Sequence, residues 1–289
     1  MWETLKIVIL SAVSGFTALL PVPSLGHFSL LKEVFGFADN KFNSGFYYAL
    51  FMLAASLAMY IVYAKTHRRI IKSFFLSKKK LENAPKFYAY RKAGRNIFLS
   101  LIPLLALAVP TGKMKFVGSL TNNFISGGSL VFTGISALFC SVLMYVSYWY
   151  TKHAEAEKVS ILAKKNAFLF GLYQLPAYIF PGISHISMGV SRTAVCDIDI
   201  RNIFKEAYLY IAPALLIVNS VKAVYCYLTV GGVNITAAVI GFVVSFIFSL
   251  ITLKAVNKAF TKKTYKIFTV YTFVFGLAVT ATALIEMFV

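Results

Sequence analysis

Two short segments of this 289-residue chain combine chemically active side chains with residues that interrupt helices. In the first segment, Ser24 and His27 follow two prolines in the sequence. In the second, Ser184 and His185 follow a Pro-Gly pair. Hydroxyl and imidazole groups near the N-terminus of a helix, where backbone N–H groups are free, suit the binding of phosphate. Both segments lie in sequence that is apolar enough to enter a bilayer, where broken backbone must be buried in protein or line a cavity. Paired breaks of this kind are typical of a binding site near the middle of a membrane.

Further polar residues accompany the second break. Ser187 follows it, and Gln174 lies in the apolar run before it, where the amide needs a partner. The catalytic candidates are His27 and His185. The predicted substrate-binding residues are Ser24, His27, Ser184, His185, Ser187 and Gln174. A purely structural alternative remains for the first segment. In it, the Ser24 side chain caps a helix and His27 provides the hydrogen-bond partner of Ser24.

Neither broken segment contains a pair of carboxylates, so the residues predict no metal site and no cofactor. Hydrolysis of a phosphoanhydride usually needs a metal or several cations to neutralise the developing charge. Lys222 lies toward one end of an apolar run, from which its ammonium group can extend to the membrane interface. A role for Lys222 in binding substrate is the less favoured alternative.

The composition predicts a polytopic membrane protein, because 59% of the residues are hydrophobic and only 13% are charged. The formal net charge is +19, and 20 of the 29 basic residues lie in three loops at 65–95, 152–165 and 254–266. This distribution follows the positive-inside rule and argues against a nucleic-acid partner. We expect a multi-pass protein of the bacterial plasma membrane, surrounded by membrane lipids, with the basic loops in the cytoplasm and both termini outside.

The apolar runs predict an all-α membrane protein of two inverted halves, residues 1–150 and 151–289, within one integral membrane domain. Each half would contain a re-entrant helical hairpin and three transmembrane helices, and the two hairpins would open from opposite sides. Re-entrant hairpins are expected at 5–31 and 167–195. Spans are expected at 46–64, 97–111, 130–150, 208–229, 235–253 and 267–289. The sequence leaves the oligomeric state open.

The two broken segments resemble motifs of the undecaprenyl-diphosphate phosphatase family, the enzymes also known as bacitracin-resistance proteins. The first family motif reads roughly E-G-x-T-E-F-L-P-V-S-S-x-G-H, and the second P-G-x-S-R-S-G-A-T. The first motif is matched without a gap by Gly15, Thr17, Leu20, Pro21, Val22, Ser24, Gly26 and His27. The second is matched by Pro181, Gly182 and Ser184. The resemblance covers nearly the whole chain and implies inverted halves whose re-entrant helices meet at a site open to the outside.

The resemblance also implies chemistry from which this chain departs. Ser14 and Ala18 replace two glutamates that are thought to hold a divalent cation, such as Mg²⁺ or Ca²⁺, or to act as acid and base. His185 replaces the arginine that is thought to hold the diphosphate, and Gly189 replaces a threonine. A neutral histidine does not substitute for a bidentate guanidinium group. We therefore expect hydrolysis by the family mechanism to be lost.

Three functions remain open at this point. In the first, the chain binds a polyprenyl lipid, undecaprenyl phosphate or diphosphate, during lipid-carrier recycling for cell-wall synthesis, without hydrolysing it. Protonated histidines would hold the phosphate, and binding would weaken as the pH rises. In the second, the chain is an active undecaprenyl-diphosphate phosphatase with a rearranged His/Ser site. In the third, it transports an unrelated small anion.

Overall fold

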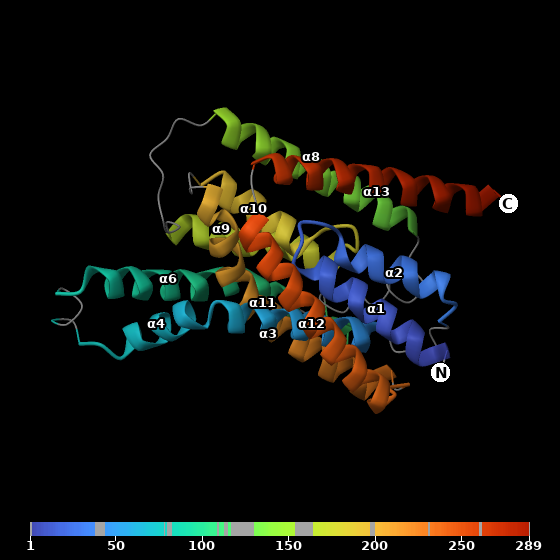
Figure 1. Ribbon diagram of the computed structural model, residues 1–289, viewed down its shortest axis with the longest axis horizontal. Coiled ribbons are helices and arrows are strands. Elements are labelled where there is room, and N and C mark those ends of the chain that lie inside the picture. The colour runs from blue at the N-terminus through green and yellow to red at the C-terminus, as the bar shows by residue number, and fades with distance from the viewer. Residues whose placement is uncertain are drawn as a thin grey trace.

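The computed structural model describes residues 2–37, 44–77, 79, 83–108, 110–112, 115–116, 130–153, 164–196, 200–230, 232–259 and 262–288. Nearly all of these residues are helical (Figure 1). The elements of the first half are α1 (Trp2–Ala18), α2 (Ser24–Val34), α3 (Ser44–Val62), α4 (Ala64–Phe74), α6 (Pro85–Leu101), the 3₁₀ helix η1 (Pro103–Ala108), the short antiparallel strands β1 (Pro110–Gly112) and β2 (Lys115–Phe116), and α8 (Leu130–His153). Those of the second half are α9 (Lys164–Ile179), α10 (His185–Ala194), α11 (Ile200–Val230), α12 (Ile235–Ala259) and α13 (Lys262–Phe288).

Five helices in the described ranges, α3, α8, α11, α12 and α13, are long and apolar enough to cross a membrane. Their apolar stretches run over Ser44–Val62, Leu130–Tyr150, Asn202–Thr229, Ile235–Lys258 and Thr264–Ile285. A spanning helix needs about 20 predominantly apolar residues, and each stretch meets that requirement. The chain is therefore a polytopic, predominantly α-helical membrane protein, as its composition predicts.

The span expected at 97–111 is not one helix. α6 ends at Leu101, η1 begins at Pro103, and the strand β1 begins at Pro110. A proline ring lacks an N–H group and clashes with the preceding turn, so Pro103 ends the regular helix. The apolar run is thus divided among three elements, although its hydropathy resembles that of a short span.

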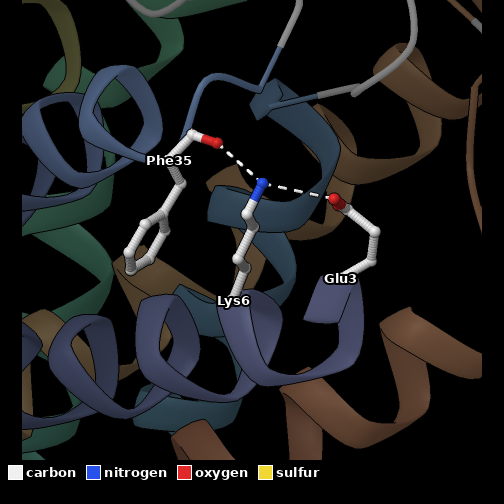
Figure 2. Close-up of polar contacts among 3 residues, drawn as sticks. All are labelled: Glu3, Lys6 and Phe35. Atoms are coloured by element: carbon white, nitrogen blue, oxygen red, sulfur yellow. Dashed lines mark hydrogen bonds and ion pairs between the residues drawn. The ribbon is translucent and has the colours of Figure 1, made fainter. Parts of the chain in front are cut away.

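The first broken segment forms a helical hairpin, in which α1 and α2 pack together on either side of residues 19–23. The open end of this hairpin is closed by Lys6 (Figure 2). The Lys6 ammonium donates to the Phe35 carbonyl at 2.9 Å and pairs with the Glu3 carboxylate at 3.2 Å. The beginning of α1 and the end of α2 therefore lie at the same end of the hairpin.

The second broken segment repeats this arrangement in the other half of the chain. α9 and α10 pack against each other on either side of residues 180–184. The Arg192 guanidinium, near the end of α10, donates to Asn166 Oδ1 near the beginning of α9 at 2.8 Å. A basic side chain thus ties together the open end of each hairpin.

The longer helices pack against one another and against the two hairpins. α3 packs along α11, α8 packs along α13, α1 packs on α12, and α9 packs on α6. α8 and α13 lie side by side along one edge, while α4 and α6 project from the end opposite the two chain termini (Figure 1). The core of large, fully buried side chains includes Leu10, Phe28, Phe51, Phe170 and Tyr208, which come from both halves.

Candidate functional site

The two broken segments meet at the carbonyl groups of the first break. The Ser184 hydroxyl of the second break donates to the Leu20 carbonyl at 3.4 Å. The carbonyls on either side also have donors, because the Tyr208 hydroxyl bonds to Leu19 at 2.6 Å and the Thr272 hydroxyl to Pro21 at 3.4 Å. These three carbonyl groups of the break are thereby satisfied inside the protein, as a bilayer requires.

The second break is seated tightly against α8. The Gly182 N–H donates to Ser136 Oγ at 3.0 Å. A Cβ atom on Gly182 would lie 2.1 Å from the Thr133 carbonyl oxygen, so this close approach requires glycine. Beyond the break, Ser184 Oγ accepts from the Ser187 N–H at 3.2 Å and caps α10. The structure therefore assigns the capping role to Ser184.

Ser24 does not cap its helix, and that alternative is wrong. The N-cap residue of α2 is Pro23, and no side chain bonds to the free N–H groups there. The buried Ser24 hydroxyl instead lies 3.0 Å from the Tyr48 hydroxyl on α3. The N-terminus of α2 therefore retains N–H groups without a side-chain cap beside a buried hydroxyl pair, which suits an anionic ligand.

His27 is held on both sides of its ring. Nδ1 lies 2.7 Å from the Pro23 carbonyl, and because a carbonyl only accepts, this nitrogen carries a proton. Nε2 lies 2.6 Å from the Tyr271 hydroxyl, from which it accepts when the ring is neutral. The ring also stacks on Phe275 with a centroid distance of 4.4 Å. Ser24 and His27, although three residues apart, are thus directed at different helices, α3 and α13.

His185 is buried, and its Nδ1 atom has no hydrogen-bond partner among the described residues. Its ring packs against Tyr178 with a centroid distance of 4.2 Å. Gln174 Nε2 donates to the His185 carbonyl at 3.1 Å, which supplies the partner that the sequence requires for this amide. Ser187 is fully buried on the same helix, beside the thiol of Cys140 on α8. Gln174, His185 and Ser187 are therefore brought together at the second break.

Three tyrosines lie beside the residues of the breaks, and neither of the two matched motifs contains them. Tyr48 contacts Ser24, Tyr178 contacts His185, and Tyr271 contacts His27. The Lys222 ammonium lies 5.9 Å from the centre of the Tyr48 ring and interacts electrostatically with His185. The sequence signals for Tyr48, Tyr178 and Lys222 are a tyrosine or a lysine within an apolar run.

The positions that differ from the resembled family offer no carboxylate. Ser14 is buried, and its hydroxyl donates to the Leu10 carbonyl at 2.7 Å, while Ala18 is buried without a polar group. A Cβ atom on Gly189 would lie 2.6 Å from Ile211 Cδ1, so this position is closely packed. In the described part of the chain, no three His, Cys, Asp or Glu residues are grouped as metal ligands. Ser14 and Ala18 therefore supply none of the carboxylate ligands that a divalent cation prefers, at the two positions where the resembled family has glutamates.

An apolar cavity adjoins the first break. Its volume is about 330 Å³, which lies within the usual range of ligand pockets. It is bordered by α1, the break, α12 and α13. Its lining includes Phe16, Leu20, Val22, Val256, Phe268 and Tyr271. Tyr271 therefore lines this apolar cavity and is also hydrogen-bonded to the His27 ring.

Comparisons with known proteins show which family this chain belongs to. Residues 7–278 match the sequence pattern of the family described as bacitracin resistance protein BacA. The chain is 23% identical to a protein named undecaprenyl-diphosphatase from Methanococcus aeolicus over 95% of this chain and 96% of that protein. It is 26% identical to a protein of the same name from Acholeplasma laidlawii, over 95% of each chain. A third such protein, from Flavobacterium johnsoniae, is 25% identical over 95% of this chain and 94% of its own.

Proposed function

Because the chain belongs to the bacitracin resistance protein BacA family, we propose that it binds polyprenyl phosphate or diphosphate where its two helix breaks meet. Undecaprenyl phosphate is the expected lipid, since several relatives are named undecaprenyl-diphosphatase. The observation that carries this proposal is the contact between Ser184 and the Leu20 carbonyl. That contact brings the beginnings of α2 and α10 to one place, and helix N-termini favour phosphate.

In this proposal, the phosphate group and the isoprene tail of the lipid bind in two different environments. The phosphate lies among Ser24, His27, Ser184 and His185. The first isoprene units of the tail occupy the apolar cavity of about 330 Å³ that adjoins Tyr271. Burial of the tail supplies affinity without polar contacts, while the break supplies recognition of the charged group.

We propose further that the fold consists of two inverted halves, residues 1–150 and 151–289, each with one re-entrant hairpin. The reciprocal packing of α1 on α12 and of α9 on α6 supports this symmetry. Lys6 and Arg192, which tie together the open ends of the hairpins, support a common side of entry and exit for each. In this topology the basic loops are cytoplasmic and both termini are outside.

Loss of hydrolysis by the family mechanism is part of the proposal. Ser14 and Ala18 provide neither a metal ligand nor a base, since the Ser14 hydroxyl already bonds to Leu10. His185 lacks the fixed pair of donors through which a guanidinium group holds a diphosphate. The remaining groups would bind a phosphate without activating water to attack it.

Purified protein in lipid nanodiscs tests both parts of this proposal. We expect wild-type protein to bind undecaprenyl phosphate and to release no phosphate from undecaprenyl diphosphate, with or without Mg²⁺ or Ca²⁺. The combined variant His27→Ala/His185→Ala should bind at least about tenfold more weakly, because two hydrogen-bonding groups are removed. His27→Gln/His185→Gln, which retains side-chain volume, controls for loss of folding. Unchanged affinity in both double variants would contradict the site.

An active phosphatase with a rearranged site is the second candidate, and the geometry of His27 favours it. The ring is fixed between the Pro23 carbonyl and the Tyr271 hydroxyl, as a positioned base would be. Turnover that disappears in His27→Ala would establish this candidate over the first. Restoring the family residues in Ser14→Glu/Ala18→Glu/His185→Arg should generate metal-dependent hydrolysis if only the catalytic groups have been lost.

A further inference from the structure

Lys222 is a half-buried lysine within the apolar stretch of α11 that extends over Asn202–Thr229. Within the described residues it has no carboxylate partner in an ion pair. A charged side chain inside a membrane protein is costly, and such residues commonly mark a ligand or ion pathway. Membrane insertion alone does not explain a lysine at this position, so Lys222 is a candidate functional residue.

The ammonium group of Lys222 lies close to residues of both breaks. It is 5.9 Å from the centre of the Tyr48 ring, and the Tyr48 hydroxyl lies 3.0 Å from Ser24 Oγ of the first break. It also interacts electrostatically with His185 of the second break. His185 Nδ1 is buried in the same region and has no hydrogen-bond partner among the described residues. A polar ligand could provide that partner. A cation, two hydroxyls and an imidazole thus gather around the first turns of α2 and α10.

Arg192, the first basic residue after the second motif, makes its contacts at another place in the hairpin. Its guanidinium bonds to Asn166 and lies over the Tyr173 ring, at the open end of the second hairpin. His185 carries no fixed positive charge. Of Arg192 and Lys222, Lys222 is the one that lies over Tyr48, the hydrogen-bond partner of Ser24.

We propose that Lys222 is a phosphate-binding residue, which provides the positive charge that this site would otherwise lack. The ammonium group leaves the face of the Tyr48 ring and donates to a phosphate oxygen held between the two breaks. An ammonium group is a compact point charge on a flexible stem, so it can contact one oxygen without the bidentate geometry of arginine. The ligand class is a phosphate monoester or diphosphate, and its identification with a polyprenyl lipid rests on the proposed function above.

The test compares Lys222→Met with Lys222→Arg in nanodisc-embedded full-length protein. Methionine retains the length and apolar character of the side chain but removes the charge, whereas arginine retains the charge. Lys254→Met, which removes an exposed lysine from α12, is the matched control for net charge. Dissociation constants are measured for undecaprenyl phosphate, phosphatidic acid and inorganic phosphate at two salt concentrations. Melting temperatures confirm folding, and Lys222→Gln replaces the methionine variant if that variant does not fold.

We expect Lys222→Met to weaken the binding of undecaprenyl phosphate about tenfold or more and to reduce its dependence on salt. Lys222→Arg should remain within about threefold of wild type, and Lys254→Met should match wild type. Equal affinity of wild type and Lys222→Met for undecaprenyl phosphate would overturn the role of Lys222 and leave the proposed function standing. If phosphatidic acid or inorganic phosphate binds in a Lys222-dependent way while undecaprenyl phosphate does not, the role of Lys222 stands and the proposed lipid is wrong. Absence of binding in all three arms overturns both.

Discussion

At the scale of single residues, the Ser184 hydroxyl joins the two halves of the chain and begins a helix at the same time. It accepts from the Ser187 N–H, which caps α10, and donates to the Leu20 carbonyl of the first break. A serine hydroxyl can fill both roles because it carries one donor and two acceptor lone pairs. The neighbouring carbonyl of Leu19 relies in the same way on Tyr208.

Ser184→Ala should therefore lower the free energy of unfolding by about 1–3 kcal/mol, because the cap is lost and the Leu20 carbonyl loses its donor. Ser184→Thr keeps the hydroxyl and should remain closer to wild type. The measurement is denaturant unfolding in detergent micelles. The control is Thr282→Ala, which removes an exposed hydroxyl that bonds only within its own helix. Equal losses in the alanine and threonine variants at residue 184 would argue against this role.

At the scale of elements, the hairpin α1–α2 is fixed by a close helix crossing. The Ser249 hydroxyl of α12 donates to the Gly15 carbonyl at 3.1 Å. A Cβ atom on Gly15 would lie 2.3 Å from the Ser245 carbonyl oxygen, so the two backbones can approach only at a glycine. Small residues at such crossings let membrane helices pack closely. Gly15 thus positions the break that follows it, in addition to belonging to the motif.

Gly15→Ala should push α1 away from α12 and lower the free energy of unfolding by about 1–3 kcal/mol. We also expect weaker binding of undecaprenyl phosphate, because the break that carries Leu20 moves with α1. Thermal unfolding followed by circular dichroism provides the measurement. Ala278→Val, at an exposed position of α13, adds volume where nothing opposes it and should leave the melting temperature near wild type. A wild-type melting temperature for Gly15→Ala would show that the crossing accommodates a methyl group.

At the scale of the whole molecule, each of the two hairpins packs on a long helix of the other part of the chain, α1 on α12 and α9 on α6. The beginning of α1 and the end of α13 lie at one end of the molecule, and α4 and α6 project from the other (Figure 1). Five helices in the described part of the chain are long and apolar enough to cross a membrane. Whether the hairpins open to opposite sides of the membrane remains a prediction, and it has a direct test.

Cysteines introduced at the open ends of the hairpins should react on opposite sides of the membrane. Trp2→Cys is expected to react with a membrane-impermeant maleimide in intact cells, whereas Lys164→Cys should react only after lysis. Both positions are exposed, while the native Cys140, Cys196 and Cys226 are buried and provide a low background. The wild-type chain is the control for that background. Labelling of both variants from the same side would exclude the inverted arrangement.

Local sequence was enough to predict the features that depend on local physics. Hydropathy located five of the six expected spans, because a membrane helix must carry its own apolar surface. Proline and glycine located both breaks, because they remove donors or permit close approach. The prediction of one span at 97–111 was wrong, because hydropathy alone does not show that Pro103 ends the helix. The expected domain ranges and the roles of the site residues remain predictions.

By itself, the sequence determined that this chain is a polytopic membrane protein with two helix breaks that carry phosphate-binding residue types. Only the tertiary structure decided which groups those residues meet. His27 is bonded to Tyr271, 244 residues away, and Ser184 to Leu20, 164 residues away. Such pairs depend on how the helices pack against one another, and no local pattern records that packing. For the same reason, the position of Lys222 over the Tyr48 ring depends on the packing of α11 beside α3.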